Sequence, residues 1–347
     1  MKAQNKSDLL YESMFAMIRD GEFKSGDKFP SEYELAERFN VNKTTANKVV
    51  ARLVSSGYLI RTRGRGGTIV AGTPQSPKGV IGYKLQLLSG QMFSSRLLYG
   101  AQLAASAHNY AMQYIENEET ADDQWEKIAA RNLAGLLLTS SSLPPEGMDI
   151  PCINVDVNAG NHIYSDDFTG GKLIAEHLFS RGHRKLAIIS NLLFTSPRVR
   201  GFCAYLNSCG LPEKAIKIFP IPPSGIFNPL ALWQEIRRTA PETTGIFCTS
   251  DAIAMQLIFQ LKEIGIECPG DISICGYGNM PLVNFLHPVT SVDQFTENLG
   301  YSACCKLIEI IENRNSDPLP LQLLTPVKLI NPNATAGQVA DRRHHLP

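Results

Sequence analysis

The sequence predicts an α/β protein in which a winged helix-turn-helix unit precedes two α/β subdomains with parallel sheets. At 347 residues the chain is too long for one ordinary hydrophobic core. Residues 39–115 contain no Asp or Glu, although the whole chain balances 33 basic against 33 acidic residues. Beyond residue 79, short apolar runs alternate with longer amphipathic stretches, which is the pattern of parallel sheets covered by helices.

The first two helices are indicated by apolar spacing and by capping residues. One face of the first helix, which should stop at Gly21, carries Leu10, Met14, Met17 and Ile18. The segment SEYE at 31–34 is a capping box, in which the serine and the second glutamate satisfy each other's backbone N–H groups. We expect it to open a second helix that continues through Phe39.

A third helix and a hairpin follow. Asn42 can cap a helix from Lys43 to about Ser55, because an asparagine oxygen accepts from a free N–H of the first turn. The apolar face of this helix is Ala46, Val49, Val50 and Leu53. The segments YLIRT and GTIVA then read as two short strands around the turn RGRGG, which is a basic wing.

Three helices and a basic hairpin predict binding to double-stranded DNA. A helix fits the major groove and its polar side chains reach base edges, while Lys and Arg neutralise phosphates. Glycines in the wing allow its backbone to approach the duplex. A solvated basic face is the alternative interpretation. The candidate DNA contacts are Ser31, Tyr33, Lys43, Thr44, Thr45, Asn47, Lys48, Arg63, Arg65 and Gly66.

Residues 9–71 also resemble the GntR family of DNA-binding domains. The matching positions include Tyr11, Ile18, Gly21, Gly26, Pro30-Ser31-Glu32, Leu35-Ala36, Phe39, Val41, Leu53, Gly57, Gly66 and Val70. The chain departs from the family where DNA is touched. Tyr33, Lys43 and Asn47 stand where many members have arginine. The resemblance therefore implies the docking mode and leaves the operator sequence open, since Lys and Asn do not reproduce an arginine fork on guanine.

The remaining chain shows no catalytic constellation. Residues 73–79, TPQSPKG, read as a linker, 80–332 as an effector domain, and 333–347 as a flexible tail. No nucleophile, metal or nucleotide motif is present, so we expect neither an enzyme nor a cofactor. The adjacent acids Asp166 and Asp167 are better explained as helix caps than as metal ligands. No CxxC pair occurs among the eight cysteines, which predicts reduced thiols.

Several later segments resemble the effector domain of the LacI/GalR family. They are SDDFTGGKLIAEHLFSRGHRKLAIIS, RVRGFCAYLNSCGL, CTSDAIAMQLIFQLKEIGIECPGDISICGYGNM and TSVDQFTENLGYSACCKLIEII. The resemblance covers about residues 80–330. It implies a two-lobed, periplasmic-binding-protein-like domain that dimerises and binds a sugar or nucleobase between its lobes.

The resemblance places the candidate effector contacts at seven positions: Phe93, Ser94, Arg198, Ser250, Asp251, Asn279 and Gln294. Phe93 and Ser94 would occupy the loop after the first strand, where the phenyl ring could stack on a sugar or instead cap a helix in the core. The Arg198 fork could hold two hydroxyls or a carboxylate, or lie free on the surface. Ser250 would touch the ligand while Asp251 caps a helix. Gly278 replaces a family aspartate, so either Asn279 compensates or the ligand is not a typical neutral sugar.

We therefore expect a dimeric transcription regulator, more specifically a repressor, whose operator binding is controlled by a small molecule, with a sugar as the first choice. A GntR-like head on a LacI-like body resembles arabinose-repressor-type regulators. The alternatives are a regulator that responds to a purine or another polar metabolite, and a solute-binding receptor with no DNA role. No apolar run spans a membrane and no signal pattern begins the chain, which predicts a cytoplasmic, nucleoid-associated protein.

Overall fold

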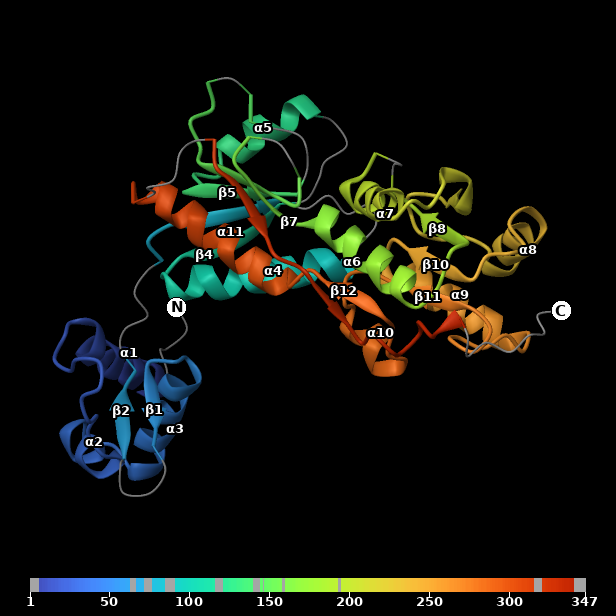
Figure 1. Ribbon diagram of the computed structural model, residues 1–347. Helices are drawn as coiled ribbons and strands as arrows, with labels where there is room; N and C mark the ends of the chain where they lie inside the picture. The colour runs from blue at the N-terminus through green and yellow to red at the C-terminus, as the bar shows by residue number, and fades with distance from the viewer. Residues whose placement is uncertain are drawn as a thin grey trace. The chain divides into compact units, whose positions relative to one another are not determined.

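The protein is described here from a computed structural model, which divides into two compact units, Met1–Pro77 and Lys78–Pro347 (Figure 1). The structure describes residues 6–62, 67–71, 77–84, 91–115, 121–139, 144–145, 147–157, 160–192, 195–314 and 320–339. Each unit is considered by itself.

The first unit contains helices α1 (Lys6–Arg19), α2 (Glu32–Arg38) and α3 (Lys43–Ser55). The predicted capping box forms at α2: Ser31 Oγ accepts from the Glu34 N–H, and Glu34 Oε2 accepts from the Ser31 N–H at 2.7 Å. At α3, Asn42 Oδ1 accepts from the Thr45 N–H at 2.8 Å, which confirms the predicted cap. The three helices share one core, whose buried members include Leu10, Met14, Ile18, Leu35, Ala46, Val49, Val50 and Leu53.

The wing of this unit consists of β1 (Leu59–Arg61) and β2 (Thr68–Val70), which pair antiparallel. Leu59 lies opposite Val70, and both side chains are buried against the helices. The predicted hairpin is therefore confirmed at its strands. Its tip, with the candidate contacts Arg63, Arg65 and Gly66, lies outside the described residues.

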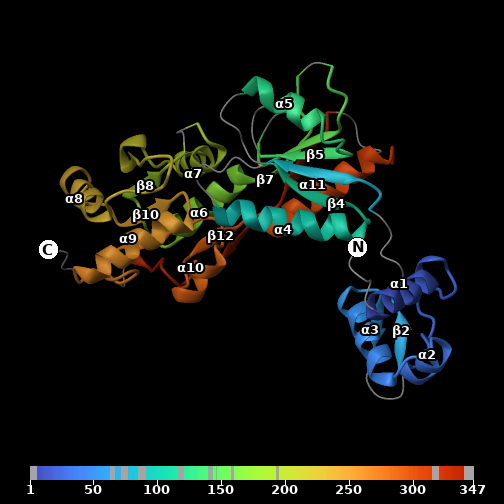
Figure 2. The same ribbon diagram turned by 180° about the vertical axis from the view of Figure 1, so that it is seen from behind.

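The first lobe of the second unit is built on a six-stranded parallel sheet in the order β13-β7-β6-β5-β3-β4. Its strands are β3 (Val80–Lys84), β4 (Ala111–Ile115), β5 (Gly135–Leu138), β6 (Cys152–Val155), β7 (His162–Ser165) and β13 (Gln322–Thr325). Helices α4 (Gln91–Ala107) and α11 (Thr296–Ile311) lie side by side on one face of the sheet, as both views show (Figures 1 and 2). Helix α5 (Ala121–Ala129) covers the opposite face.

The second lobe contains a four-stranded parallel sheet in the order β11-β10-β8-β9. Its strands are β8 (Leu186–Ser190), β9 (Ile216–Pro220), β10 (Gly245–Cys248) and β11 (Ser273–Cys275). Helices α6 (Asp167–Ser180) and α7 (Pro197–Ser208) pack on one face, and α8 (Pro229–Thr239) and α9 (Asp251–Glu263) on the other. The short helix α10 (Pro281–Leu286) follows β11, and a 3-10 turn (Glu213–Ala215) precedes β9. Two parallel sheets with helices on both faces confirm the predicted fold class.

The chain passes between the lobes three times. It crosses from β7 to α6, from β12 (Ser291–Asp293) to α11, and from β13 to β14 (Lys328–Ile330). Strands β12 and β14 pair antiparallel, so two of the three crossings are tied together beside the second lobe. Three thin connections between two packed lobes form a hinge, because few contacts have to change when the lobes rotate.

Two sequence-based boundaries need correction. The tail was expected to begin at residue 333, but residues 333–339 pack on the second lobe. Thr335 and Ala336 are buried, and the Val339 N–H donates to the Arg181 carbonyl. Phe93 and Ser94 were expected in a loop, whereas α4 already begins at Gln91 and places both in its first turn. Helix ends read from periodicity are uncertain by a turn, because the terminal residues lack intrahelical partners.

Candidate effector site and nucleic-acid interface

Glycines bring the first turns of α6 and α7 into close contact. A Cβ on Gly171 would lie 2.0 Å from the carbonyl oxygen of Arg198, and one on Gly201 would lie 1.9 Å from that of Phe168. Only residues without a side chain allow backbones to approach this closely. The GG of TGGK and the G of RGF therefore set the separation of the two helices. As a result, Asp167 at the start of α6 faces Arg198 at the start of α7.

Arg198 and Asp167 form a largely buried ion pair. Arg198 Nη2 donates to Asp167 Oδ2 at 2.8 Å, and the two side chains are 11% and 18% exposed. Arg198 Nη1 donates to the Thr249 carbonyl at 2.6 Å, and the guanidinium lies 3.7 Å from the centroid of the Tyr277 ring. The buried Nε atom has no hydrogen-bond partner among the described residues. The sequence alternative of a free surface arginine is therefore wrong, and the pair leaves guanidinium donors for a further group.

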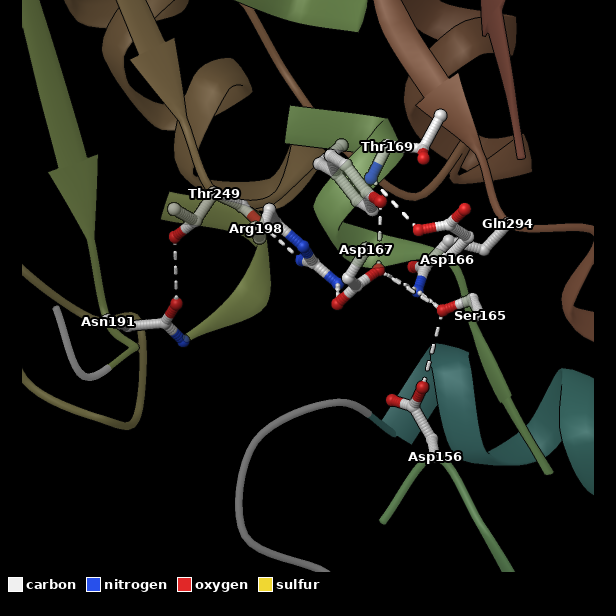
Figure 3. Close-up of polar contacts among 10 residues, drawn as sticks. Asp156, Ser165, Asp166, Asp167, Thr169, Asn191, Arg198, Thr249 and Gln294 are labelled. Atoms are coloured by element: carbon white, nitrogen blue, oxygen red, sulfur yellow. Dashed lines mark hydrogen bonds and ion pairs between the residues drawn. The ribbon is translucent and has the colours of Figure 1, made fainter. Parts of the chain in front are cut away.

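The carboxylate of Asp167 is the centre of a polar cluster that joins both lobes (Figure 3). Its Oδ1 accepts from Tyr277 Oη at 2.8 Å, from Ser165 Oγ at 3.1 Å and from Gln294 Nε2 at 3.2 Å. Gln294 Nε2 also donates to Ser165 Oγ at 2.8 Å. Ser165 ends β7 and Tyr277 follows β11, so groups from the carboxyl ends of both sheets meet here, where α/β proteins bind ligands.

Asp156 adds a second carboxyl group to this cluster. It follows β6, and its Oδ1 lies 3.3 Å from Ser165 Oγ. Burial, and then the negative charge of Asp167, raise the pKa of Asp156 to about 7, against the opposing charge of Arg198. The hydrogen bonds agree with this direction, because the single hydroxyl proton of Ser165 cannot satisfy two carboxylates at once. A proton on Asp156 allows both contacts to form.

This raised pKa predicts that stability depends on pH. Below about pH 4, Asp156 is protonated in both the folded and the unfolded chain and contributes no difference. From there to about pH 7 only the unfolded chain releases the proton, so the free energy of unfolding should fall as pH rises. We expect Asp156→Asn to remove this loss and to gain about 1–2 kcal/mol relative to the parent between pH 5 and pH 8.

Urea unfolding of the parent and of Asp156→Asn at both pH values would measure the effect. Asn is a suitable replacement because residue 156 has a φ of 61°, which asparagine tolerates. Asp149→Asn, at an exposed position before β6, is the matched control and should show no such change. An equal difference between parent and Asp156→Asn at pH 5 and pH 8 would contradict the assignment.

The other predicted effector residues at the second lobe have structural partners. Ser250 caps α9, where its Oγ accepts from the Ile253 N–H. Asp251 is fully buried, and its carboxylate accepts from Ser291 Oγ at 2.6 Å and from the Met280 N–H at 2.8 Å. The cap is thus Ser250 rather than Asp251, which instead joins α9 to the segments around β12.

Asn279 lies at the hinge. Its Nδ2 donates to Asp293 Oδ2 at 2.8 Å, and its Oδ1 accepts from Asn284 Nδ2 at 2.7 Å. The preceding Gly278 has a φ of 115°, a backbone conformation that disfavours the aspartate of the family pattern. The side chain of Asn279 therefore fixes the loop after β11 and is not oriented as a replacement carboxylate.

Arg96 on α4 is a connection between the lobes that the sequence did not reveal. Its Nε and Nη2 donate to the two carboxylate oxygens of Glu297 on α11, each at 2.7 Å. Its Nη1 donates to the carbonyls of Gly278 and Asn279, at 3.1 and 3.0 Å. Ser94, one turn away, accepts from Tyr83 Oη through its carbonyl, and Phe93 packs half-buried against the core of the first lobe.

The candidate DNA contacts of the first unit lie on α2, α3 and β1. Lys43, Thr44, Asn47 and Lys48 are exposed on one face of α3. The Lys43 ammonium lies 3.7 Å from the centroid of the exposed Tyr33 ring. The Thr45 hydroxyl donates to Asn42 Oδ1 at 2.8 Å, so it belongs to the helix cap. Ser31 Oγ is likewise engaged with Glu34.

Sequence reasoning missed Asp156, Ser165 and Tyr277, and explained Asp167 only as a cap. The N-cap is Asp166, whose Oδ1 accepts from the Thr169 N–H at 2.9 Å, and this frees Asp167 for Arg198. One usable signal was present: two adjacent acids need two roles, since a helix N-terminus has one capping position.

The described residues contain no group of three potential ligands that could hold a metal ion. Over the same residues, no helix combines the length and the apolar character needed to cross a bilayer. All eight cysteines are free, and burial raises the pKa of Cys152 and Cys304 to about 12 in each case.

Comparisons with known proteins match the two units separately. Residues 6–70 match the family of bacterial regulatory proteins of the gntR type, and residues 175–331 match the periplasmic binding protein-like domain family. An arabinose metabolism transcriptional repressor from Geobacillus stearothermophilus is 24% identical over 94% of this chain and 96% of its own length. The transcriptional repressor PurR of Actinobacillus pleuropneumoniae is 29% identical over 60% of this chain and 68% of its own.

Among solved structures, a LacI family transcriptional regulator from Enterococcus faecium with bound ribose is similar in fold. It superposes with a TM-score of 0.63 at 21% identity, over 75% of this chain and 99% of its own.

Proposed function

We propose that this chain, which joins a GntR-type DNA-binding domain to a periplasmic-binding-protein-like domain, is a transcriptional repressor whose operator binding is controlled by a small polyhydroxylated molecule. The observation that carries the proposal is the presence of both domains in one chain. The first unit has a core of its own and an exposed polar helix face, and the second has converging polar groups where its lobes meet. A domain that reads DNA and one that binds a small molecule together make a regulated DNA-binding protein.

The chemistry of the cluster supports hydroxyl groups as the recognised feature. The charge of Arg198 is offset by Asp167, which makes the site unattractive for an anion. Buried donors on the guanidinium and an acceptor on Asp156 remain, and a sugar hydroxyl both donates and accepts. Arg198 and Gln294 belong to this cluster. The proposed effector set keeps Phe93, Ser94, Ser250, Asp251 and Asn279 as residues that shape and hold its surroundings.

We assign dimer formation to exposed apolar side chains of the second unit. Phe285 on α10 is 86% exposed, and Tyr99 on α4 is 58% exposed. Leu103, Leu282 and Leu286 on the same two helices are also exposed. Apolar side chains clustered at the surface in this way mark an interaction site, and a second copy of the chain would supply a symmetric partner.

Effector binding would act by changing the angle between the lobes. The cluster joins β7, α6, α7 and the segment after β12, so a ligand there bears on two of the three crossings. Lobe rotation would be transmitted through Arg96 to α4, which carries part of the proposed dimer surface. The spacing of the two DNA-binding units would then change, with a coupling free energy of typically about 1–3 kcal/mol. The protein acts in the cytoplasm, where its operator is.

Mobility-shift titration of the purified full chain against promoter-region fragments, at several salt concentrations, tests the proposal. We expect binding that weakens steeply as salt increases and that one sugar of a panel reverses. Thermal-shift screening against sugars, nucleobases and amino acids should identify that sugar, since a ligand at 100 times its dissociation constant adds about 2.7 kcal/mol. Absence of salt-sensitive DNA binding with and without these metabolites would refute the function, and stabilisation by a nucleobase alone would change the effector class.

A further inference from the structure

Three elements of the DNA-binding unit meet at one exposed asparagine. Arg61 Nη2, from the first strand of the wing, donates to Asn47 Oδ1 on α3 at 2.6 Å. The same nitrogen lies 3.4 Å from Glu32 Oε1 at the start of α2. Asn47 thus belongs to the proposed reading helix, while its partners come from the wing and the preceding helix.

The chemistry of arginine fixes the orientation of the Asn47 amide. A guanidinium has only donors, so the amide atom that faces it has to be the oxygen. The Asn47 amino group, Nδ2, then points away from Arg61 and has no partner among the described residues. Asn47 therefore presents two N–H donors to its surroundings, while its strongest acceptor is already engaged.

This orientation changes which base Asn47 can read. An asparagine recognises adenine through two bonds, accepting from N6 and donating to N7, and this needs a free Oδ1. Guanine offers two acceptors, O6 and N7, on its major-groove edge. An amide that presents only donors is complementary to guanine and cannot form the pair of bonds to adenine.

Glu32 supports a positioning role for Arg61. A carboxylate on a DNA-facing surface opposes phosphate binding, and its contact reduces the charge that Arg61 would offer to the backbone. A residue that served only to neutralise phosphate would be better without this neighbour. Held between an amide oxygen and a carboxylate, the guanidinium is restricted to a few rotamers and fixes the amide with it.

We propose that Arg61 determines specificity by holding Asn47 as a donor, so that the base pair facing Asn47 is read as guanine rather than adenine. The inference rests on the proposed DNA-binding function and adds to it the base preference and the residue that sets it. Arg61 acts through Asn47 and does not itself have to touch a base.

Selection of bound duplexes from a random 20-base-pair library with the full chain would test this. The position read by Asn47 is the one whose preference disappears in Asn47→Ala. Here we expect the parent to favour guanine over adenine on the order of tenfold, and Arg61→Ala to reduce that ratio to about twofold because Oδ1 is freed. In an Asn47→Ala background, Arg61→Ala should cause no further change of preference at this position.

Lys48→Ala is the matched control, since it removes an exposed charge from the same helix without touching the amide. It should weaken all sequences alike and flatten the dependence of log affinity on log salt by about 0.9. The proposal is overturned if the parent prefers adenine at the Asn47 position, if Arg61→Ala lowers affinity uniformly, or if its effect on preference persists without Asn47. Failure of the parent to enrich any sequence would instead refute the DNA-binding function itself.

Discussion

Replacing Arg198 with alanine is expected to abolish effector binding and to lower the free energy of unfolding of the second unit by roughly 3 kcal/mol. The change removes the partner of a largely buried carboxylate, because Asp167 would keep its negative charge while it loses the guanidinium at 2.8 Å. It also removes the bond to the Thr249 carbonyl and the contact with the Tyr277 ring. Removing one member of a buried pair costs much more than the pair contributes as a whole, since the remaining charge stays desolvated.

Operator binding by the same variant should persist in the absence of effector. The first unit has its own hydrophobic core, formed from α1, α2, α3 and the two wing strands. Destabilisation of the second unit does not remove any contact in this core. We therefore expect a protein that binds the operator but no longer responds to the ligand.

Urea unfolding and ligand-induced thermal shifts, measured with mobility-shift titrations on one preparation, would separate these effects. Arg200→Ala is the matched control, since Arg200 lies on the same helix but is exposed. Arg198→Lys retains the charge and should recover part of the stability, but not the two-point hydrogen bonding of the guanidinium. An Arg198→Ala protein that binds the effector with parental affinity would exclude this cluster as the effector site.

The second large effect is expected for Gly171→Ala, which should destabilise the second unit by about 3 kcal/mol, the upper end of the usual cost of overpacking. The new methyl group would lie 2.0 Å from the Arg198 carbonyl and 2.9 Å from the Phe202 nitrogen. Both atoms belong to the backbone of α7 and cannot rotate away, so the two helices have to separate. Alanine favours a helix over glycine by about 1 kcal/mol, which is too little to offset this clash.

Separation of α6 from α7 should also weaken effector binding, because it moves Arg198 away from Asp167. Thermal unfolding and ligand titration of Gly171→Ala would measure both consequences. Gly270→Ala is the matched control, since its Cβ would have its nearest neighbour at 3.7 Å, an ordinary contact. A Gly171→Ala protein as stable as the parent would show that the helices tolerate a wider separation than the fold implies.

The DNA-binding unit could be predicted in detail because its determinants are local. The SEYE capping box and the Asn42 cap each join residues three positions apart, and both form as expected. The apolar face of α3 follows from helical periodicity alone, and its four predicted residues are buried. Even here, the bond between Asn47 and Arg61 was not predictable, since it joins residues 14 positions apart on two elements.

The second unit was predictable as a pattern but not as a site. Strands β6 and β7 were missed because they are four-residue segments with little alternation. Phe93 was assigned to a loop because the start of a helix has no strong sequence signal where no capping residue precedes it. Asp251 matched a family motif, yet its carboxylate serves the packing of the second lobe.

What the sequence determined by itself is therefore the kind of each domain: periodicity, caps and turn residues act over a few positions, and they specify helices, strands and their order. The tertiary structure alone decided which polar side chains share a site. Asp167 meets Arg198, Tyr277 and Gln294 across 31, 110 and 127 positions of the chain. Such contacts depend on how closely two glycine-lined helices pack and on where two sheets end, and no local interaction encodes either distance.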